Sequence, residues 1–113
     1  MTKHSTNLDR IFQALSDPTR RDFLARMSDG PISVSALAGP TGFALPTVMK
    51  HLGILEEAAL IATEKSGRIR MCRARPETLA ATSIWLEDQR ALWEARTDRL
   101  ECYLYSLEKD DLP

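Results

Sequence analysis

The fold is decided by residues 32–75, which read ISVSALAGPTGFALPTVMKHLGILEEAALIATEKSGRIRMCRAR. The first part predicts a helix-turn-helix over about residues 33–58, in which Ser33 caps the first helix and Gly42 supplies the positive φ that the turn needs. The second part predicts a two-stranded wing over about residues 61–75, joined by the turn Ser66-Gly67-Arg68. A helix-turn-helix followed by a basic hairpin is the arrangement that lays one helix in the major groove of DNA.

The second helix of this motif is expected over about residues 45–58, with one apolar and one outward face. Its core stripe, at positions i, i+4 and i+7, consists of Val48, Leu52 and Leu55, with Leu45 one turn earlier. At about 100° per residue, the residues opposite this stripe are Pro46, Lys50 and Gly53, flanked by Thr47 and Met49. A DNA groove would meet this outward face.

Two further helices are expected before the motif. Apolar residues at i, i+3, i+4 and i+7 from Leu8 to Leu15 predict a helix over about residues 7–15. Asp17 is placed as the N-cap and Pro18 as the first residue of the next helix, which continues to about Ser28. In this second helix Phe23, Leu24 and Met27 are expected to point inward and Arg20, Arg21 and Arg26 outward.

A long final helix is expected over about residues 76–109. Leu79, Leu86, Trp93, Leu100 and Leu107 recur every seven residues. A helix of ~30 residues spans about 45 Å, more than a small domain can cover, so the stripe predicts packing against a second copy, with the first two turns in the domain's own core. The residues assigned to the dimer interface are Leu8, Ile11, Phe12, Leu86, Trp93, Leu100, Tyr103, Leu104 and Leu107.

Length and composition indicate one winged helix domain over residues 1–113, mostly α with a small β-hairpin and a long C-terminal dimerisation helix. The net charge of −1 hides an asymmetry, because residues 1–76 carry a net +4 and residues 77–113 a net −5. A basic front suits contact with a polyanion. The chain has no apolar run that predicts a membrane span or signal peptide, and its two cysteines form no disulfide framework, so a cytoplasmic protein is expected.

Several blocks of sequence are similar to the ArsR/SmtB family of bacterial winged-helix repressors. The resemblance rests on the blocks DPTRR (17–21), SVSALA (33–38), LPTVMKHL (45–52) and LEEAALI (55–61), on Gly67-Arg68, and on Trp85-Leu86 through Trp93. It extends over about residues 8–107. The resemblance implies a homodimer with its first and last helices at the interface, bound to an imperfect inverted repeat of double-stranded DNA. Where this family often has a Ser cap and a Gly helix end, the chain has Ala44 and Ala59.

The DNA-binding candidates come from the outward helix, the wing and the start of the second helix. Thr47 and Lys50 are the best placed for bases or phosphates, because Lys can bond guanine and a Thr methyl can meet thymine. The full set is Arg20, Arg21, Leu45, Pro46, Thr47, Met49, Lys50, His51, Lys65, Arg68 and Arg70. Within this set His51 lies at the edge of the core stripe, which favours a hydrogen-bonded structural role. Arg73 and Arg75 are alternatively partners for acidic residues of the last helix.

No cofactor or metal is expected. Relatives that sense metals through their third helix carry ELCxC, whereas the matching residues here, 36–40, contain no thiolate, and residues 77–113 contain no His. Cys72 and Cys102 allow a redox sensor as an alternative, although small buried cysteines are more common. A small-molecule effector is compatible with the sequence but not identified by it.

Two other classes of function compete with a transcriptional regulator. The apolar Pro46 and Met49 on the outward helix face are compatible with a winged-helix adaptor that binds protein. Catalysis is not expected, because the sequence has no nucleophile paired with a base, no paired acids in a cleft context and no phosphate-binding Gly loop.

Overall fold

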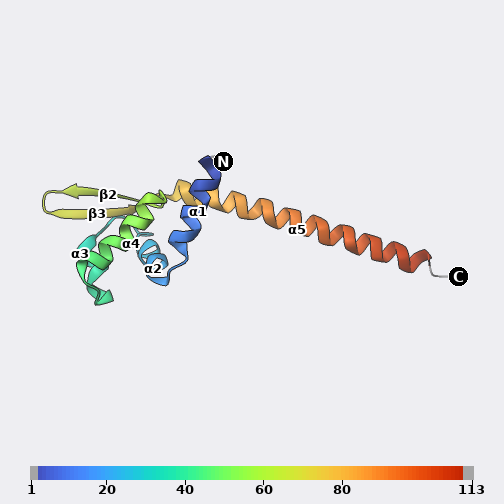
Figure 1. The fold of residues 1–113 in the computed structure, drawn as a ribbon, viewed down its shortest axis with the longest axis horizontal. Helices are drawn as coiled ribbons and strands as arrows, with labels where there is room; N and C mark the ends of the chain where they lie inside the picture. Colours follow the sequence, from blue (N-terminus) through green and yellow to red (C-terminus); the bar gives the residue numbers. More distant parts are fainter. Residues whose placement is uncertain (1–2, 111–113) are drawn as a thin grey trace. The chain divides into compact units, whose positions relative to one another are not determined.

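The computed structural model describes the backbone of residues 3–110 and the side chains of residues 7–108. In chain order the elements are α1 (Lys3–Leu15), α2 (Pro18–Arg26), β1 (Ile32–Ser33), α3 (Val34–Ala38), the 3₁₀ turn η1 (Gly39–Thr41), α4 (Leu45–Glu57), β2 (Ile61–Ser66), β3 (Ile69–Ala74) and α5 (Pro76–Asp110) (Figure 1). The fold class expected from the sequence, mostly α with a winged helix-turn-helix, is confirmed. The chain divides into two compact units, with the boundary after Ala80 inside α5.

The local signals for the helix starts are confirmed. The Asp17 carboxylate accepts a hydrogen bond from the Arg20 backbone N–H (3.1 Å), and Pro18 is the first residue of α2. The Ser33 hydroxyl oxygen likewise accepts from the Ala36 backbone N–H (3.1 Å) at the start of α3. Gly42, after η1, has a φ of 70°. These three positions set the direction in which the chain enters α2, α3 and α4.

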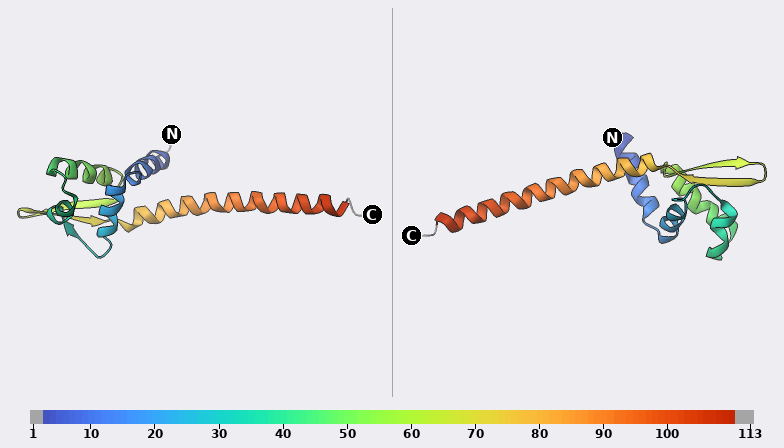
Figure 2. Two further views of the ribbon diagram at one scale, coloured as in Figure 1. Left: turned by 90° about the horizontal axis from the view of Figure 1, so that it is seen from below. Right: turned by 180° about the vertical axis from the view of Figure 1, so that it is seen from behind.

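The wing is part of a three-stranded antiparallel sheet, in the order β1-β3-β2. The hairpin β2–β3 was expected, and its strands lie side by side in every view (Figure 2). β1 was not expected, because two residues are too few to show a period of two. Ile32 of β1 lies opposite Cys72 and Ser33 opposite Met71. This pairing makes β3 the central strand and ties the wing to the start of α3.

The core of the first unit is built around one face of α4. Val48, Leu52 and Leu55 have at most 1% of their surface exposed, as the sequence pattern predicted. Leu45, expected one turn earlier on the same stripe, is instead 58% exposed, because it lies in the first turn of α4, beyond the core. The side chains that complete the buried cluster include Phe23, Leu37, Leu60, Ile61 and Cys72. Ile11 corrects one prediction: it is 2% exposed within this core, so it has no surface left to give to a dimer interface. Its neighbour Phe12 stays on the surface.

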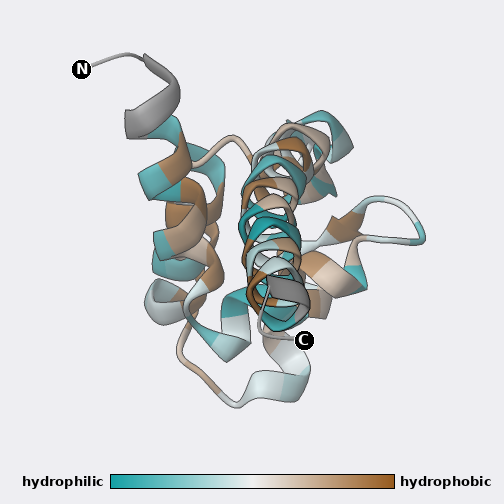
Figure 3. Cartoon of the chain, turned by 90° about the vertical axis from the view of Figure 1, so that its right-hand side faces the viewer, coloured by the Kyte–Doolittle hydropathy of each residue, from teal (hydrophilic) through white to brown (hydrophobic). Residues whose placement is uncertain are grey.

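α5 is one continuous helix, as predicted, and beyond its first turns it carries many exposed apolar side chains. The large ones among them are Ile84, Trp85, Leu86, Leu92, Trp93, Leu100, Tyr103, Leu104, Tyr105 and Leu107. Apolar and polar segments alternate along this helix (Figure 3). Within the described residues, no helix combines the length and the apolar character that crossing a bilayer would require.

The end of α4 is strained at Ala59, where a Gly would be usual in the family that the sequence resembles. Ala59 has a φ of 60°, in the left-handed region. The turn is nonetheless well bonded: the backbone N–H groups of Ala59 and Leu60 donate to the carbonyls of Glu56 (2.9 Å) and Leu55 (3.0 Å). The Thr78 hydroxyl donates to the Ala59 carbonyl (2.5 Å). The chain therefore holds an alanine in a conformation that costs roughly 1–2 kcal/mol for an L-residue.

Replacing Ala59 with Gly is expected to stabilise the protein. The substitution removes the left-handed penalty on the native side, and this gain exceeds the entropic cost of one more Gly. We expect the free energy of unfolding in urea to rise by about 1 kcal/mol. Ala58→Gly, one residue earlier at a φ of −79°, is the control and is expected to lower it. A lower stability for Ala59→Gly would contradict this account of the turn.

Candidate nucleic-acid interface

The outward face of α4 is free of intramolecular cover. Pro46, Thr47, Met49 and Lys50 are all exposed, and they occupy the first two turns of the helix. Gly53 continues the same face one turn later, and a Cβ built there would meet no atom within 4 Å. A Gly in a helix interior costs about 1 kcal/mol relative to Ala, and no internal contact of this chain requires it. This face of α4 is therefore open toward solvent.

Both flanks of α4 are held by polar contacts. On one flank His51 contacts Arg20 of α2, with 3.1 Å between the His51 Nδ1 and Arg20 Nη1 atoms. On the other flank the Thr63 hydroxyl of β2 donates to the Glu56 carboxylate (3.2 Å to Oε1). Arg70 of β3 donates in turn to the Thr63 hydroxyl oxygen (3.3 Å). The helix is therefore tied to α2 on one side and to the wing on the other.

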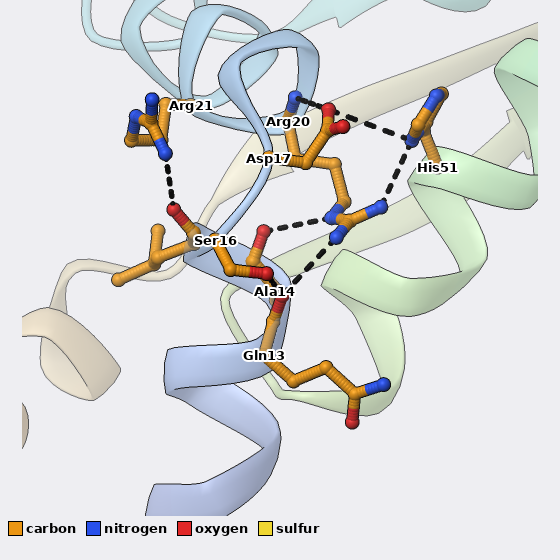
Figure 4. A network of polar contacts seen from close by, with 8 residues as sticks. Gln13, Ala14, Ser16, Asp17, Arg20, Arg21 and His51 are labelled. Atoms are coloured by element: carbon orange, nitrogen blue, oxygen red, sulfur yellow. Dashed lines mark hydrogen bonds and ion pairs between the residues drawn. The ribbon is translucent and has the colours of Figure 1, made fainter.

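Arg20 is the centre of the network shown in Figure 4. Its Nε donates to the Ala14 carbonyl (2.7 Å) and its Nη2 to the Gln13 carbonyl (3.1 Å), so it caps the C-terminal end of α1. Arg26 similarly donates to the carbonyls of Leu37 (3.0 Å) and Ala36 (2.7 Å) at the end of α3. The expectation that these two side chains simply point outward is therefore wrong, because their guanidinium groups satisfy helix-end carbonyls.

His51 lies between Arg20 and Asp17. A guanidinium has no acceptor, so Arg20 is the donor in its contact with the His51 Nδ1 atom. The Asp17 carboxylate lies 3.9 Å from the same Nδ1 atom. Although burial acts to raise it, the pKa of Asp17 is lowered overall by the hydrogen bond from the Arg20 backbone N–H and by the Arg20 charge. The ring of His51 also packs edge-on against Phe23, which supports its structural role.

The wing carries an exposed basic tip. Lys65, Arg68 and Arg70 are exposed, and Gly67 between the strands has a φ of 64°, as the turn requires. Arg75 instead forms an ion pair with Glu77 (2.9 Å), the second residue of α5. This agrees with the alternative considered for Arg75 in the sequence. Among the side chains of residues 7–108, the wing cations Lys65, Arg68 and Arg73 form none of the ion pairs or hydrogen bonds that the structure shows.

The two cysteines differ in their surroundings, and neither has a partner thiol. Cys72 is fully buried in the sheet, and burial raises the pKa of its thiol, with the Arg70 charge acting in the opposite direction. A reactive thiol needs access and a lowered pKa, so the redox alternative loses its support at Cys72. Cys102 is exposed on α5. Among the described residues no group of three or more His, Cys, Asp or Glu side chains could hold a metal ion.

Comparisons with known proteins agree with this geometry. A family defined by a helix-turn-helix domain matches residues 15–64. The chain is 38% identical over 73 residues to the HTH-type transcriptional regulator Rv2034 of Mycobacterium tuberculosis, covering 65% of this chain and 68% of that protein. It is 31% identical over 79 residues to the transcriptional repressor SdpR of Bacillus subtilis, covering 70% of this chain and 88% of that protein.

Among solved structures, a crystal structure of an ArsR family transcriptional regulator is 50% identical with a TM-score of 0.74, covering 78% of this chain and 97% of that one. The chain belongs to the ArsR family of transcriptional regulators. An ArsR-like regulator from Rhodococcus sp. RHA1 is 30% identical with a TM-score of 0.77, covering 88% and 94% of the two chains. The protein is thus a DNA-binding transcriptional regulator of a family that does not consist of enzymes.

Arg20→Ala is expected to destabilise the protein strongly, because it leaves the Ala14 and Gln13 carbonyls and the His51 ring without their charged donor. Hydrogen bonds to charged groups contribute ~1.5–3 kcal/mol each, so we expect a loss of at least about 2 kcal/mol in urea unfolding. Arg21→Ala is the matched control. Arg21 is exposed and donates to the Leu15 carbonyl alone (2.7 Å), and its loss is expected to cost less than about 0.5 kcal/mol. Equal losses of stability for the two variants would contradict this structural role of Arg20.

Proposed function

We propose that this ArsR regulator is a dimeric repressor that binds an inverted-repeat DNA operator with α4 in the major groove of each half-site. The observation that carries the proposal is the open outward face of α4 next to a basic wing tip. One helix and one hairpin presented side by side in this way match the two grooves of a duplex. The name of the relative SdpR, a transcriptional repressor, supports repression as the direction of regulation.

Each candidate residue is assigned a role in DNA binding from its position in the fold. Thr47 and Lys50, together with Leu45, Pro46 and Met49, face the base edges from the first two turns of α4. Arg68 and Lys65 of the wing tip contact phosphate or the minor groove, and Arg70 borders them. Arg21 is exposed and remains a candidate for a backbone phosphate. Arg20 and His51 act through the position of α4 rather than by touching DNA, since their polar groups are used within the fold.

The second copy would be held through α1 and α5. The side chains Leu86, Trp93, Leu100, Leu104 and Leu107 lie along one side of α5 and are exposed in the single chain. A continuous stripe of exposed apolar side chains marks an interaction site, and a repeat of seven is the spacing that pairs helices. Leu8 and Phe12 of α1 and Tyr103 of α5 complete the proposed interface. A cytoplasmic protein without a membrane partner fits this function.

Lys50→Ala combined with Arg68→Ala is expected to weaken binding to DNA without dissociating the dimer. Each cation that neutralises a phosphate adds about one unit to the slope of log affinity against log salt concentration. We expect the affinity for DNA upstream of the regulator's own gene to fall at least about tenfold and the slope to shrink by up to ~2. Gel-shift titrations at several salt concentrations measure both quantities.

The control for this pair is Arg99→Ala, which removes an exposed positive charge from α5. It should leave the affinity and the salt slope close to those of the unmodified protein. An unchanged affinity for the Lys50/Arg68 double variant would remove these residues from the interface.

Trp93→Glu is expected to separate the dimer into monomers, because it places a charge in the centre of the apolar stripe. Trp93 is 65% exposed in the single chain. Ile84, at 64%, is equally exposed, but nine residues of about 100° each turn it to the opposite side of the helix. Ile84→Glu is therefore a matched control and should remain dimeric. Sedimentation velocity distinguishes the two states, and dissociation by Ile84→Glu alone would place the interface on the other face of α5.

A further inference from the structure

The outward face of α4 has few groups that can hydrogen-bond to bases. Its first two turns offer the Thr47 hydroxyl and the Lys50 ammonium, and α4 contains no Arg, Asn or Gln. Arg makes the commonest bidentate contact with guanine, which Lys can also make, and Asn and Gln make those with adenine. Beside this face, on the flank of α4 toward the wing, two large apolar side chains one turn apart are exposed, Leu45 at 58% and Met49 at 37%. The composition of this face therefore does not match recognition by hydrogen bonds alone.

Leu45 and Met49 lie together at one hollow rather than as scattered exposed residues. With Ile69 of β3, which is 56% exposed, they line a hollow of about 390 Å³ between α4, the wing and residues 33–35 at the start of α3. Arg68 and Arg70 line the same hollow. Apolar side chains beside positive charges complement a DNA duplex, because phosphates border its major groove and thymine methyl groups lie within that groove. A protein partner would need acidic groups placed around an apolar anchor to match the same surface.

We propose that Leu45 and Met49 are specificity-determining residues that read the 5-methyl groups of thymine in the major groove. The thymine methyl is the apolar group that base edges present there, and apolar side chains are its usual partners. Cytosine has a hydrogen at the same position, so a methyl contact distinguishes a T·A pair from a C·G pair without any hydrogen bond. The inference rests on the proposed function, because it requires α4 to enter the major groove.

Ile69 provides a control within the same hollow. It is as exposed as Leu45 and lines the same hollow, but it belongs to the wing. In the proposed complex the wing contacts phosphates or the minor groove, where thymine presents no methyl group. Loss of Ile69 should therefore leave methyl recognition unchanged, whereas loss of Leu45 or Met49 should remove it.

The test uses the full-length protein and duplexes that it selects from a random pool. The selected duplexes are then resynthesised with deoxyuridine in place of thymidine at one half-site position at a time, which removes the methyl group and keeps the base pair. Affinities are measured for the unmodified protein, for Leu45→Ser and Met49→Ser, and for Ile69→Ser as the control. Circular dichroism checks that each variant is folded, as expected for substitutions of exposed side chains.

We expect the selected half-sites to contain thymine opposite α4, and deoxyuridine to weaken binding of the unmodified protein about fourfold for each contacted methyl, the factor for burying one methyl-sized group. Leu45→Ser or Met49→Ser should abolish the fourfold difference at one position, whereas Ile69→Ser should retain it. Tight binding that is equal for thymidine and deoxyuridine duplexes would overturn this inference and leave the proposed function intact. Failure to select any duplex would overturn both.

Discussion

The proposed DNA-binding surface depends on how α4 is oriented about its own axis. The buried stripe of Val48, Leu52 and Leu55 presses one side of the helix into the core. The contact of His51 with Arg20 holds one flank, and the contact of Glu56 with the wing holds the other. Because contacts fix three sides of the helix, they also determine which side faces solvent. The same restraints that stabilise the fold therefore determine which side chains α4 presents to solvent.

The parts of this structure that could be predicted from the sequence are those decided by near neighbours. Asp17 and Ser33 cap their helices because a short polar side chain reaches an N–H three residues ahead. Gly42 and Ala59 take left-handed conformations at turns whose position follows from the helix ends around them. The outward face of α4 also followed from periodicity, since the angle per residue is nearly constant in any α-helix.

Features that depend on distant partners could not be predicted. The sequence shows Arg20 on a polar helix face, but its acceptors lie at the end of the preceding helix and on a ring 31 residues away. The strand β1 exists because Ile32 and Ser33 meet β3 across the sheet. Ile11 fits an apolar stripe that could equally have faced a second copy, and packing within the unit decided its burial. In each case the sequence pattern identifies the residue, but only the folded structure shows which distant residue it contacts.

The local weaknesses of α4 have a consequence for how the protein folds. The helix begins at Ala44 without a side-chain cap, contains Gly53 in its interior and ends at a left-handed Ala59. An isolated segment of 13 residues is already marginal as a helix in water, and these three residues lower its helicity further. α4 therefore forms together with the core it packs against. Partly folded chains carry no preformed recognition helix, and the ability to bind DNA appears in a single cooperative step with the fold.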